Sequence, residues 1–424
     1  MTSTAGRFLE DEKRLGYVGF NQDSSSLSVG TRDGYQLYSL NSIDKLELIH
    51  SYVGEKDLSI VARLFSSSLI AVVSLSAPRK LKVCHFKKDT EICNYSYSNS
   101  ILSVKLNRQR LVVCLEESIY IHNIKDMKVI HTISSTSPNP AGICDLTPNE
   151  RSYLAYPSTS QAGTLQIFDT ETLKPVSKIT AHDNPLAAMS FDSTGCRIAT
   201  ASEKGTVIRV FSVPDGAKLW EFRRGVKRCV TISTLAFSSN SLYLAASSNT
   251  ETVHIFKLEK KEESTPVEET QSWAGYFTSA LKSSAAYLPT PVTDVINQFR
   301  AFATCKLEHS GQKTICALPI IQKMQCVLAV SETGTLYVYT IDPLEGGECH
   351  LVRKHIIGGG SLLCKEETEE RPLACPSKTG TKSSSDSPPS DSQSYQDVEP
   401  PGGSPSETLK LDDDSEFPPM SQEL

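Results

Sequence analysis

The chain has 424 residues and a net charge of −6. Residues 361–424 hold 14 acidic and 5 basic side chains, so their net charge of −9 leaves +3 for residues 1–360. This small excess argues against a nucleic-acid-binding surface on the body of the chain. No apolar run reaches the 18 residues of a membrane span, and residues 1–14 are too polar for a signal-peptide core.

Apolar residues make up 39 % of the chain and charged residues 22 %, which is enough for a buried core. The twelve cysteines are scattered between Cys84 and Cys375, and none forms a CxxC pair. We therefore expect free buried thiols rather than a zinc site or a disulfide framework.

A short strand-like motif that ends in an aromatic side chain or histidine recurs along the chain. Period-2 alternation and β-branched residues precede each of these ends. Five of the six intervals lie near the length of a four-stranded propeller blade, and the sixth, of 83 residues, is longer by roughly one blade. We predict an all-β, seven-bladed β-propeller with divergent WD repeats and one large insertion. The short interval of 36 residues predicts a lost strand or tight turns. The motifs end at Tyr38, Phe86, His122, Phe168, Phe211, Phe256 and Tyr339, at intervals of 48, 36, 46, 43, 45 and 83 residues.

The first segment with a possible recognition role is the basic turn LNRQR at residues 106–110. Together with Lys105, it presents the cations Arg108 and Arg110 between two predicted strands. It is either a solvated turn or a docking cleft for an acidic segment.

The clearest repeat is residues 181–216, in which LAAMSF, RIATAS and TVIRVF form consecutive strands. His182 opens this unit, and Phe211-Ser212 stands where a WD repeat carries Trp-Asp. Because histidine at this place in a WD repeat is commonly a buried hydrogen-bonding residue, we do not expect His182-Asp183 to act as an acid–base pair.

Adjacent arginines follow this repeat in EFRRGVKRC, residues 221–229. Side chains of consecutive residues on an extended backbone point to opposite sides. Arg223 and Arg224 should therefore serve two neighbouring sites rather than clamp one ligand, or else lie on a solvated surface. Hydroxyl side chains and a histidine flank the pair on each side. A guanidinium ringed by hydroxyls suits a phosphate group.

Two segments lie outside the repeats. Residues 259–300 begin with charged residues and continue with an apolar stripe at helical spacing that includes Trp273, Phe277 and Leu281. The stripe is a membrane contact or a helix packed on the side of the propeller. Residues 359–424 are rich in Ser, Pro and acidic residues, and we expect them to be disordered. We place an N-terminal extension at residues 1–16 and the propeller at 17–358.

No sequence motif supports catalysis. GxSxG, P-loop, GxGxxG and HExxH patterns are absent from the sequence, and the nine histidines are dispersed. We expect a non-enzymatic protein without a cofactor or a bound metal.

Residues 222–225 (FRRG), between SEKGTVIRVF and SSNTETVHIF, resemble the PROPPIN family of phosphoinositide-binding propellers, and its WIPI branch in particular. The resemblance extends over roughly residues 17–345. It implies two head-group pockets for phosphatidylinositol 3-phosphate and phosphatidylinositol 3,5-bisphosphate. The first pocket would use His182, Thr200, Ser202, Gly205, Thr206, Arg209 and Arg223. The second would use Arg224, Gly225, Ser248, Thr252 and His254.

The resemblance also implies that the insertion contacts the membrane through Trp273, Tyr276, Phe277 and Leu281. Lys105, Arg108 and Arg110 would dock protein partners, the autophagy conjugation scaffold and lipid-transfer proteins among them. The implied protein is a monomeric, cytoplasmic effector recruited to phagophore and endosomal membranes during autophagosome formation. The alternative is a WD-repeat scaffold for proteins alone, without lipid specificity.

Overall fold

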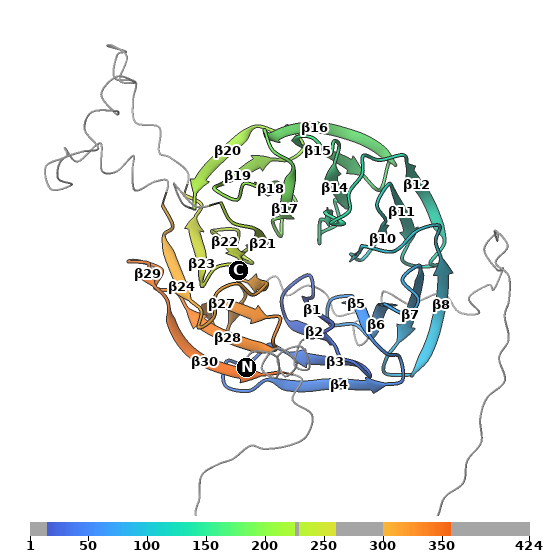
Figure 1. Ribbon diagram of the computed structural model, residues 1–424, viewed down its shortest axis with the longest axis horizontal. Helices are drawn as coiled ribbons and strands as arrows, with labels where there is room; N and C mark the ends of the chain where they lie inside the picture. Colours follow the sequence, from blue (N-terminus) through green and yellow to red (C-terminus); the bar gives the residue numbers. More distant parts are fainter. Residues whose placement is uncertain (1–14, 225–228, 260–299, 358–424) are drawn as a thin grey trace, which may run out of the picture. The chain divides into compact units, whose positions relative to one another are not determined.

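Antiparallel four-stranded sheets repeat along the chain and stand side by side around a central axis (Figure 1). The computed structural model describes residues 15–224, 229–259 and 300–357. Within these ranges the regular structure is all β, and seven sheets follow one another as the blades of a propeller. The predicted fold class is therefore confirmed.

The first four blades occupy residues 17–182. Blade one contains β1 (Tyr17–Phe20), β2 (Ser26–Gly30), β3 (Gly34–Ser39) and β4 (Glu47–Val53). Blade two contains β5 (Leu58–Arg63), β6 (Leu69–Ser74), β7 (Lys80–His85) and β8 (Thr90–Ser96). Blade three contains β9 (Ser103–Leu106), β10 (Arg110–Cys114), β11 (Ser118–Asn123) and β12 (Val129–Ser134). Blade four contains β13 (Asp145–Leu146), β14 (Tyr153–Pro157), β15 (Gly163–Asp169) and β16 (Lys174–His182).

The last three blades occupy residues 186–356. Blade five contains β17 (Leu186–Phe191), β18 (Arg197–Ser202), β19 (Val207–Ser212) and β20 (Lys218–Arg223). Blade six contains β21 (Ile232–Phe237), β22 (Tyr243–Ser248), β23 (Thr252–Lys257) and β24 (Ala303–Lys306). Blade seven contains β25 (Thr314–Ala317), β27 (Met324–Ser331), β28 (Thr335–Thr340) and β30 (His350–Ile356). The two-residue strand β26 (Ile320–Ile321) pairs with β27.

The recurring motif marks the end of the third strand in every blade. Six of its terminal residues lie in such strands, and Phe86 directly follows β7. The short interval of 36 residues, from Phe86 to His122, contains all its strands: β9 and β10 have four and five residues, and only residues 107–109 separate them. Tight turns therefore explain this interval.

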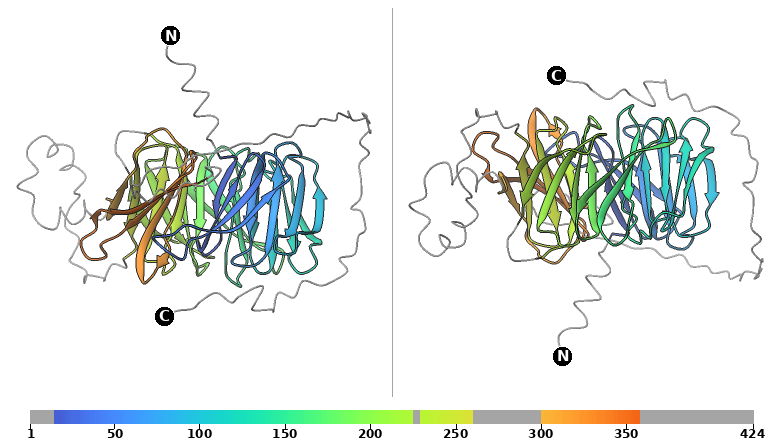
Figure 2. Two further views of the ribbon diagram at one scale, coloured as in Figure 1. Left: turned by 90° about the horizontal axis from the view of Figure 1, so that it is seen from below. Right: turned by 90° about the horizontal axis from the view of Figure 1, so that it is seen from above.

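Apolar side chains fill the seams between neighbouring blades. Middle strands such as β6 and β22 are buried along their whole length, whereas the outermost strands β4 and β30 are mostly exposed. Seen from the side, the blades stand next to one another with their strands running between the two faces of the ring (Figure 2). One apolar cluster of the described residues joins each pair of adjacent blades. The cluster that contains Leu27 of blade one and Leu328 of blade seven closes the ring by side-chain packing. Each seam therefore holds two blades at a fixed separation.

Blade six contains two additions to the repeat. Residues 258–302 connect its third strand, β23, to its outermost strand, β24. The short strand β29 (Gly347–Glu348), from the connection between β28 and β30, pairs in parallel with β24. In the described part of the chain, no helix has the length and apolar character needed to cross a bilayer.

Candidate functional site

The paired arginines lie where the outermost strand of blade five ends. Phe222 is buried and its ring stacks on that of Phe256 in blade six, with centroids 4.7 Å apart. Arg223, the last residue of β20, is exposed, and Arg224 is half-buried. The buried phenylalanine thus fixes the strand end at which the exposed and the half-buried arginine follow each other.

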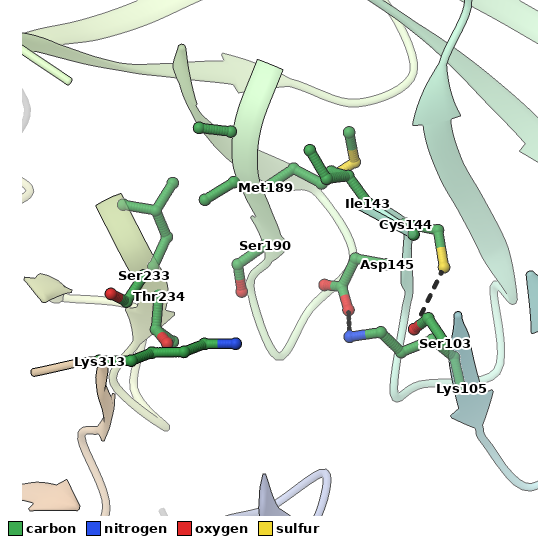
Figure 3. Close-up of a pocket in the computed structure, with 14 residues that line it drawn as sticks. Ser103, Lys105, Ile143, Cys144, Asp145, Met189, Ser190, Ser233, Thr234 and Lys313 are labelled. Carbon is green, nitrogen blue, oxygen red and sulfur yellow. Dashed lines mark hydrogen bonds and ion pairs between the residues drawn. The ribbon is translucent and has the colours of Figure 1, made fainter. Parts of the chain in front are cut away.

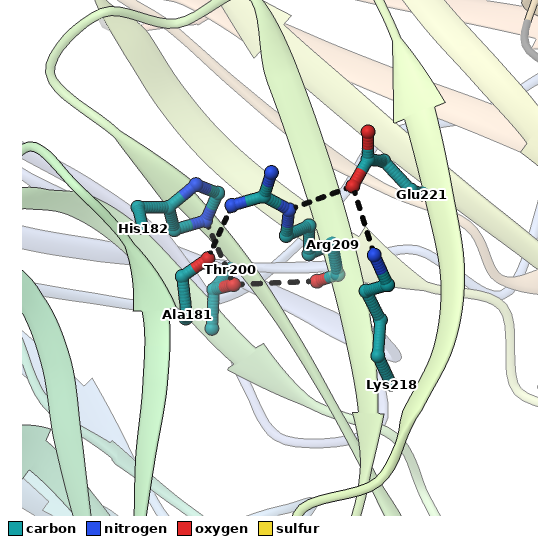
Figure 4. A network of polar contacts seen from close by, with 6 residues as sticks. All are labelled: Ala181, His182, Thr200, Arg209, Lys218 and Glu221. Atoms are coloured by element: carbon teal, nitrogen blue, oxygen red, sulfur yellow. Dashed lines mark hydrogen bonds and ion pairs between the residues drawn. The ribbon is translucent and has the colours of Figure 1, made fainter.

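The seam between blades four and five holds a polar network that centres on Arg209 (Figure 4). Its Nε donates to a carboxylate oxygen of Glu221 at 2.9 Å, and its Nη1 donates to the carbonyl oxygen of Ala181 at 2.6 Å. The imidazole Nε2 of His182 lies 3.0 Å from the hydroxyl oxygen of Thr200, which donates to the carbonyl oxygen of Arg209 at 3.3 Å. Blade four supplies the histidine and blade five supplies the hydroxyl and the guanidinium.

Charge in this seam is partly compensated. The ion pair with Glu221 neutralises Arg209, and Lys218 lies 3.3 Å from the same carboxylate oxygen. Arg223 is an exposed cation at the same end of this blade as Lys204, and its side chain makes no hydrogen bond or ion pair with another described residue. The N–H groups of Arg209 that face neither Glu221 nor Ala181 remain as further donors.

The seam between blades five and six has a second polar group around Arg224. Its Nη2 donates to the hydroxyl oxygens of Ser248, at 3.0 Å, and Thr250. These two hydroxyl oxygens lie 3.0 Å apart. Thr252 and His254 follow on β23, two residues apart and on one face of the strand. Arg224 therefore reaches from blade five into blade six, as the alternation of side chains predicted.

The two polar groups occupy corresponding places in successive seams. His182 pairs with Gly163 at the end of blade four's outermost strands, and the backbone N–H of Arg224 donates to the carbonyl oxygen of Thr206 at the same place in blade five. His182 contacts the hydroxyl of Thr200 on the second strand of blade five, and Arg224 contacts the hydroxyl of Ser248 at the end of the second strand of blade six. The repeat thus builds two similar sites, in which His182 and Arg224 occupy the corresponding position.

A tight turn lies between the two seams. The backbone N–H of Gly205 donates to the carbonyl oxygen of Ser202 at 2.9 Å, and Gly205 has a φ of +63°. A Cβ atom here would lie 1.8 Å from the carbonyl oxygen of Val230. Only glycine fits this turn, which packs directly on the chain that enters blade six.

The histidines of both seams have depressed pKa values. Burial, followed by the charge of Arg209, lowers the pKa of His182 to about 4. Burial, followed by the charge of Arg224, lowers the pKa of His254 to about 4. Both imidazoles are therefore neutral near pH 7 and leave the positive charge of each seam to arginine.

This neutral burial predicts a loss of stability in acid. Between pH 6.5 and about 4 an unfolded His182 binds a proton that the folded one does not, so stability falls as pH falls. At pH 5 this single histidine should cost about 2 kcal/mol. The melting temperature of the His182→Gln variant should therefore drop less between pH 7.5 and pH 5.0 than that of the wild type. Equal drops would contradict the neutral state of the buried imidazole.

The structure separates the three cations of the basic turn. Lys105 pairs with Asp145 at 3.1 Å and lines the central cavity. The Arg108 guanidinium lies 4.9 Å from the ring centroid of Phe65 in blade two. The Nε of Arg110 donates to the carbonyl oxygen of Thr170, which follows the third strand of blade four. The three cations therefore do not share one cleft. Lys105 lies on an innermost strand, Arg108 contacts blade two and Arg110 contacts blade four.

Several predicted site residues fall outside the described part of the chain. They are Gly225 of the second pocket and the apolar stripe Trp273, Tyr276, Phe277 and Leu281. The two predicted pockets did not include Glu221, or Thr250, which the sequence shows only as one of the hydroxyl residues beside the arginine pair. The sequence does contain a sign of Thr250, because it lies two residues after Ser248 and both carry hydroxyl groups. Glu221 becomes recognisable only from the pairing of β19 with β20, which places it opposite Arg209.

Comparison with known proteins identifies the family. The PROPPIN family model matches residues 14–358. The chain belongs to the PROPPIN family. It is 54 % identical over 418 residues to WD repeat domain phosphoinositide-interacting protein 2 of Xenopus laevis, with 96 % of each chain covered. It is 50 % identical to the human WD repeat domain phosphoinositide-interacting protein 1, over 96 % of this chain and 94 % of the relative.

More distant relatives share the same propeller. Autophagy-related protein 18 of Caenorhabditis elegans is 41 % identical, with 97 % of each chain covered. Among solved structures, a complex of KlAtg21 with the coiled-coil of AgAtg16 matches this PROPPIN with a TM-score of 0.64 and 26 % identity. That match covers 81 % of this chain and 99 % of the solved one. The named relatives are thus phosphoinositide-interacting and autophagy-related proteins.

Proposed function

We propose that this PROPPIN binds phosphatidylinositol 3-phosphate and phosphatidylinositol 3,5-bisphosphate on membranes and recruits autophagy proteins there. The observation that carries the proposal is the pair of similar polar groups in successive seams. One contains Arg209 and His182 with the hydroxyl of Thr200, and the other contains Arg224 with the hydroxyls of Ser248 and Thr250. Guanidinium N–H groups bind phosphate through charge-assisted hydrogen bonds, and hydroxyls add neutral donors. The names of the relatives agree with phosphoinositides as the ligand class.

Arg223 and Arg224 take different roles in this proposal. Arg223 is exposed and is the cation that the first head group meets, beside the N–H groups left on Arg209. Arg224 is already oriented by Ser248 and Thr250, so little side-chain entropy remains to be lost when a phosphate binds. Two weak sites on one rigid ring gain affinity for a membrane through their high effective concentration.

The experiment that tests this function uses the full chain and liposomes that differ only in the 3-phosphate of the inositol ring. We expect flotation with phosphatidylinositol 3-phosphate and not with phosphatidylinositol at the same mole fraction. Liposomes with an equal charge of phosphatidylserine separate head-group recognition from general attraction of cations. Equal flotation with all three lipids would favour the alternative, a protein scaffold without lipid specificity.

We also propose that a coiled-coil autophagy protein docks near Arg108. The KlAtg21 structure contains such a partner. Arg108 lies in the turn after β9, in the third blade, whereas Arg223 ends β20 in the fifth blade. A partner bound at Arg108 would therefore not cover the paired arginines. Recruitment to phagophore and endosomal membranes would follow when lipid and protein are bound together.

The insertion supplies the third contact in this proposal, and it gives a testable prediction. Replacing Trp273 and Phe277 by serine should speed dissociation from liposomes about a hundredfold or more, since each buried apolar side chain contributes about 1.5–3 kcal/mol. Affinity for a soluble head group should not change, because the seams are formed by residues outside the insertion. Liposome dissociation by stopped flow and calorimetry with soluble inositol 1,3-bisphosphate measure the two effects separately.

Tryptophan fluorescence provides the control, because the chain has only Trp220 and Trp273. The indole N–H of Trp220 donates to the carbonyl oxygen of Glu259 at 2.9 Å, and the Arg197 guanidinium lies 5.2 Å from its ring centroid. In a Trp220→Phe variant, Trp273 alone emits, and liposomes should shift its emission to the blue. An unshifted spectrum from protein that still floats would contradict the proposal that the insertion contacts the membrane through Trp273.

A further inference from the structure

A cavity of about 340 Å³ opens among the innermost strands, apart from both seams (Figure 3). Blades three, four, five and six line it, together with the segment that precedes β25. Three of its lining residues carry charge: Lys105, Asp145 and Lys313. The proposed lipid contacts use none of them.

Asp145 is already bonded on both carboxylate oxygens. Oδ1 accepts a hydrogen bond from the Lys105 ammonium at 3.1 Å, and Oδ2 accepts one from the backbone N–H of Phe191 at 2.8 Å. The carboxylate therefore links strands of blades three, four and five. It neutralises Lys105, whose ammonium still has two N–H groups for another acceptor.

Lys313 approaches the cavity from the opposite side. Its ammonium points across the open space toward that of Lys105, as Figure 3 shows. Lys313 is exposed and forms no ion pair with another residue of the described ranges. The lining residues therefore carry one uncompensated positive charge, and two ammonium groups face each other.

Neutral donors surround the same space. Ser190, Ser233 and Thr234 also line the cavity, from blades five and six, and the Ser190 hydroxyl already donates to the carbonyl oxygen of Phe191 at 3.3 Å. An anion beside Lys313 would compensate the charge of this lysine and accept hydrogen bonds from the remaining N–H groups of Lys105 and from the Thr234 hydroxyl. A cavity of this volume lies in the range of small-ligand sites and is too small for a folded protein segment.

We propose that the central cavity binds a small phosphate-bearing anion between Lys105 and Lys313. Two sources share this chemistry: inorganic phosphate and a phosphorylated sugar small enough for the cavity. The site does not depend on the lipid seams, so it survives if the proposed membrane function fails.

Calorimetry on the full chain tests the site, with Arg223→Ala and Arg224→Ala as the background that removes phosphate contacts at the seams. We expect this protein to bind inorganic phosphate, and Lys313→Gln to weaken that binding at least tenfold, since a charge-assisted bond to phosphate is lost. Lys125→Gln, which removes an exposed lysine from a blade-three turn, is the matched control and should bind as before. Glucose 6-phosphate that binds more tightly than phosphate would identify the sugar class, and equal binding would identify phosphate.

Three results would overturn the proposal. They are the absence of phosphate binding, equal affinity in the Lys313→Gln and Lys125→Gln variants, and phosphate binding that the background substitutions alone remove. Lys313 is exposed, so its variant should fold, and an unchanged melting temperature without ligand checks this. Flotation of Lys313→Gln on lipid at the wild-type level shows that the two sites are separate.

Discussion

Replacing Arg223 and Arg224 together by alanine should abolish flotation with liposomes that contain phosphatidylinositol 3-phosphate. Each charge-assisted hydrogen bond to phosphate contributes about 1.5–3 kcal/mol, so the loss of one arginine weakens its site roughly tenfold to a hundredfold. Because the two sites act together on one membrane, the double variant loses both affinities and the avidity between them. Flotation measures this directly.

The single variants should retain partial binding, because each leaves one seam intact. Arg223→Ala removes an exposed side chain and should not change stability. Arg224→Ala leaves Ser248 and Thr250 bonded to each other, which limits its cost to the fold. Arg151→Ala, an exposed arginine of blade four, is the matched control for lost positive charge. Wild-type flotation of a folded double variant would remove the seams as the lipid site.

Much of the fold was predictable because one local pattern repeats. The third strand of each blade buries the same positions, so it has the same order of apolar and polar residues. Phe168, Phe211 and Phe256 therefore recur at nearly constant spacing. The long last interval contains no strand end of this kind because residues 258–302 lie between β23 and β24. The pairing of β29 with β24 was not predictable, since two residues carry no periodic signal.

The candidate site was predictable only where its signal is local. The directions of Arg223 and Arg224 follow from strand alternation, which two adjacent residues display. The Arg209–Glu221 ion pair depends on the register between two strands, which the sequence does not state. The central cavity could not be predicted from the sequence, because Lys105, Asp145 and Lys313 come to line one space only when the blades are arranged in a ring.

Gly205→Ala should lower the melting temperature by at least about 5 °C and weaken lipid binding at both seams. A non-glycine residue at this φ of +63° costs about 1 kcal/mol or more in backbone strain. The added Cβ would also lie 1.8 Å from the carbonyl oxygen of Val230, so the turn or the start of blade six must move. The same turn carries Thr206, whose carbonyl oxygen holds the backbone N–H of Arg224, so this displacement reaches the site.

Gly311→Ala separates backbone strain from collision. Gly311 has a φ of +88°, but no atom lies within 4 Å of the Cβ it would gain. Its variant should therefore lose only the strain cost of about 1 kcal/mol, which is a shift of a few degrees at most, and keep full flotation. If both alanine variants melt at the same temperature, the close approach of Gly205 to Val230 does not contribute to stability. If Gly205→Ala also floats like the wild type, lipid binding at the seams does not depend on how closely blades five and six approach each other.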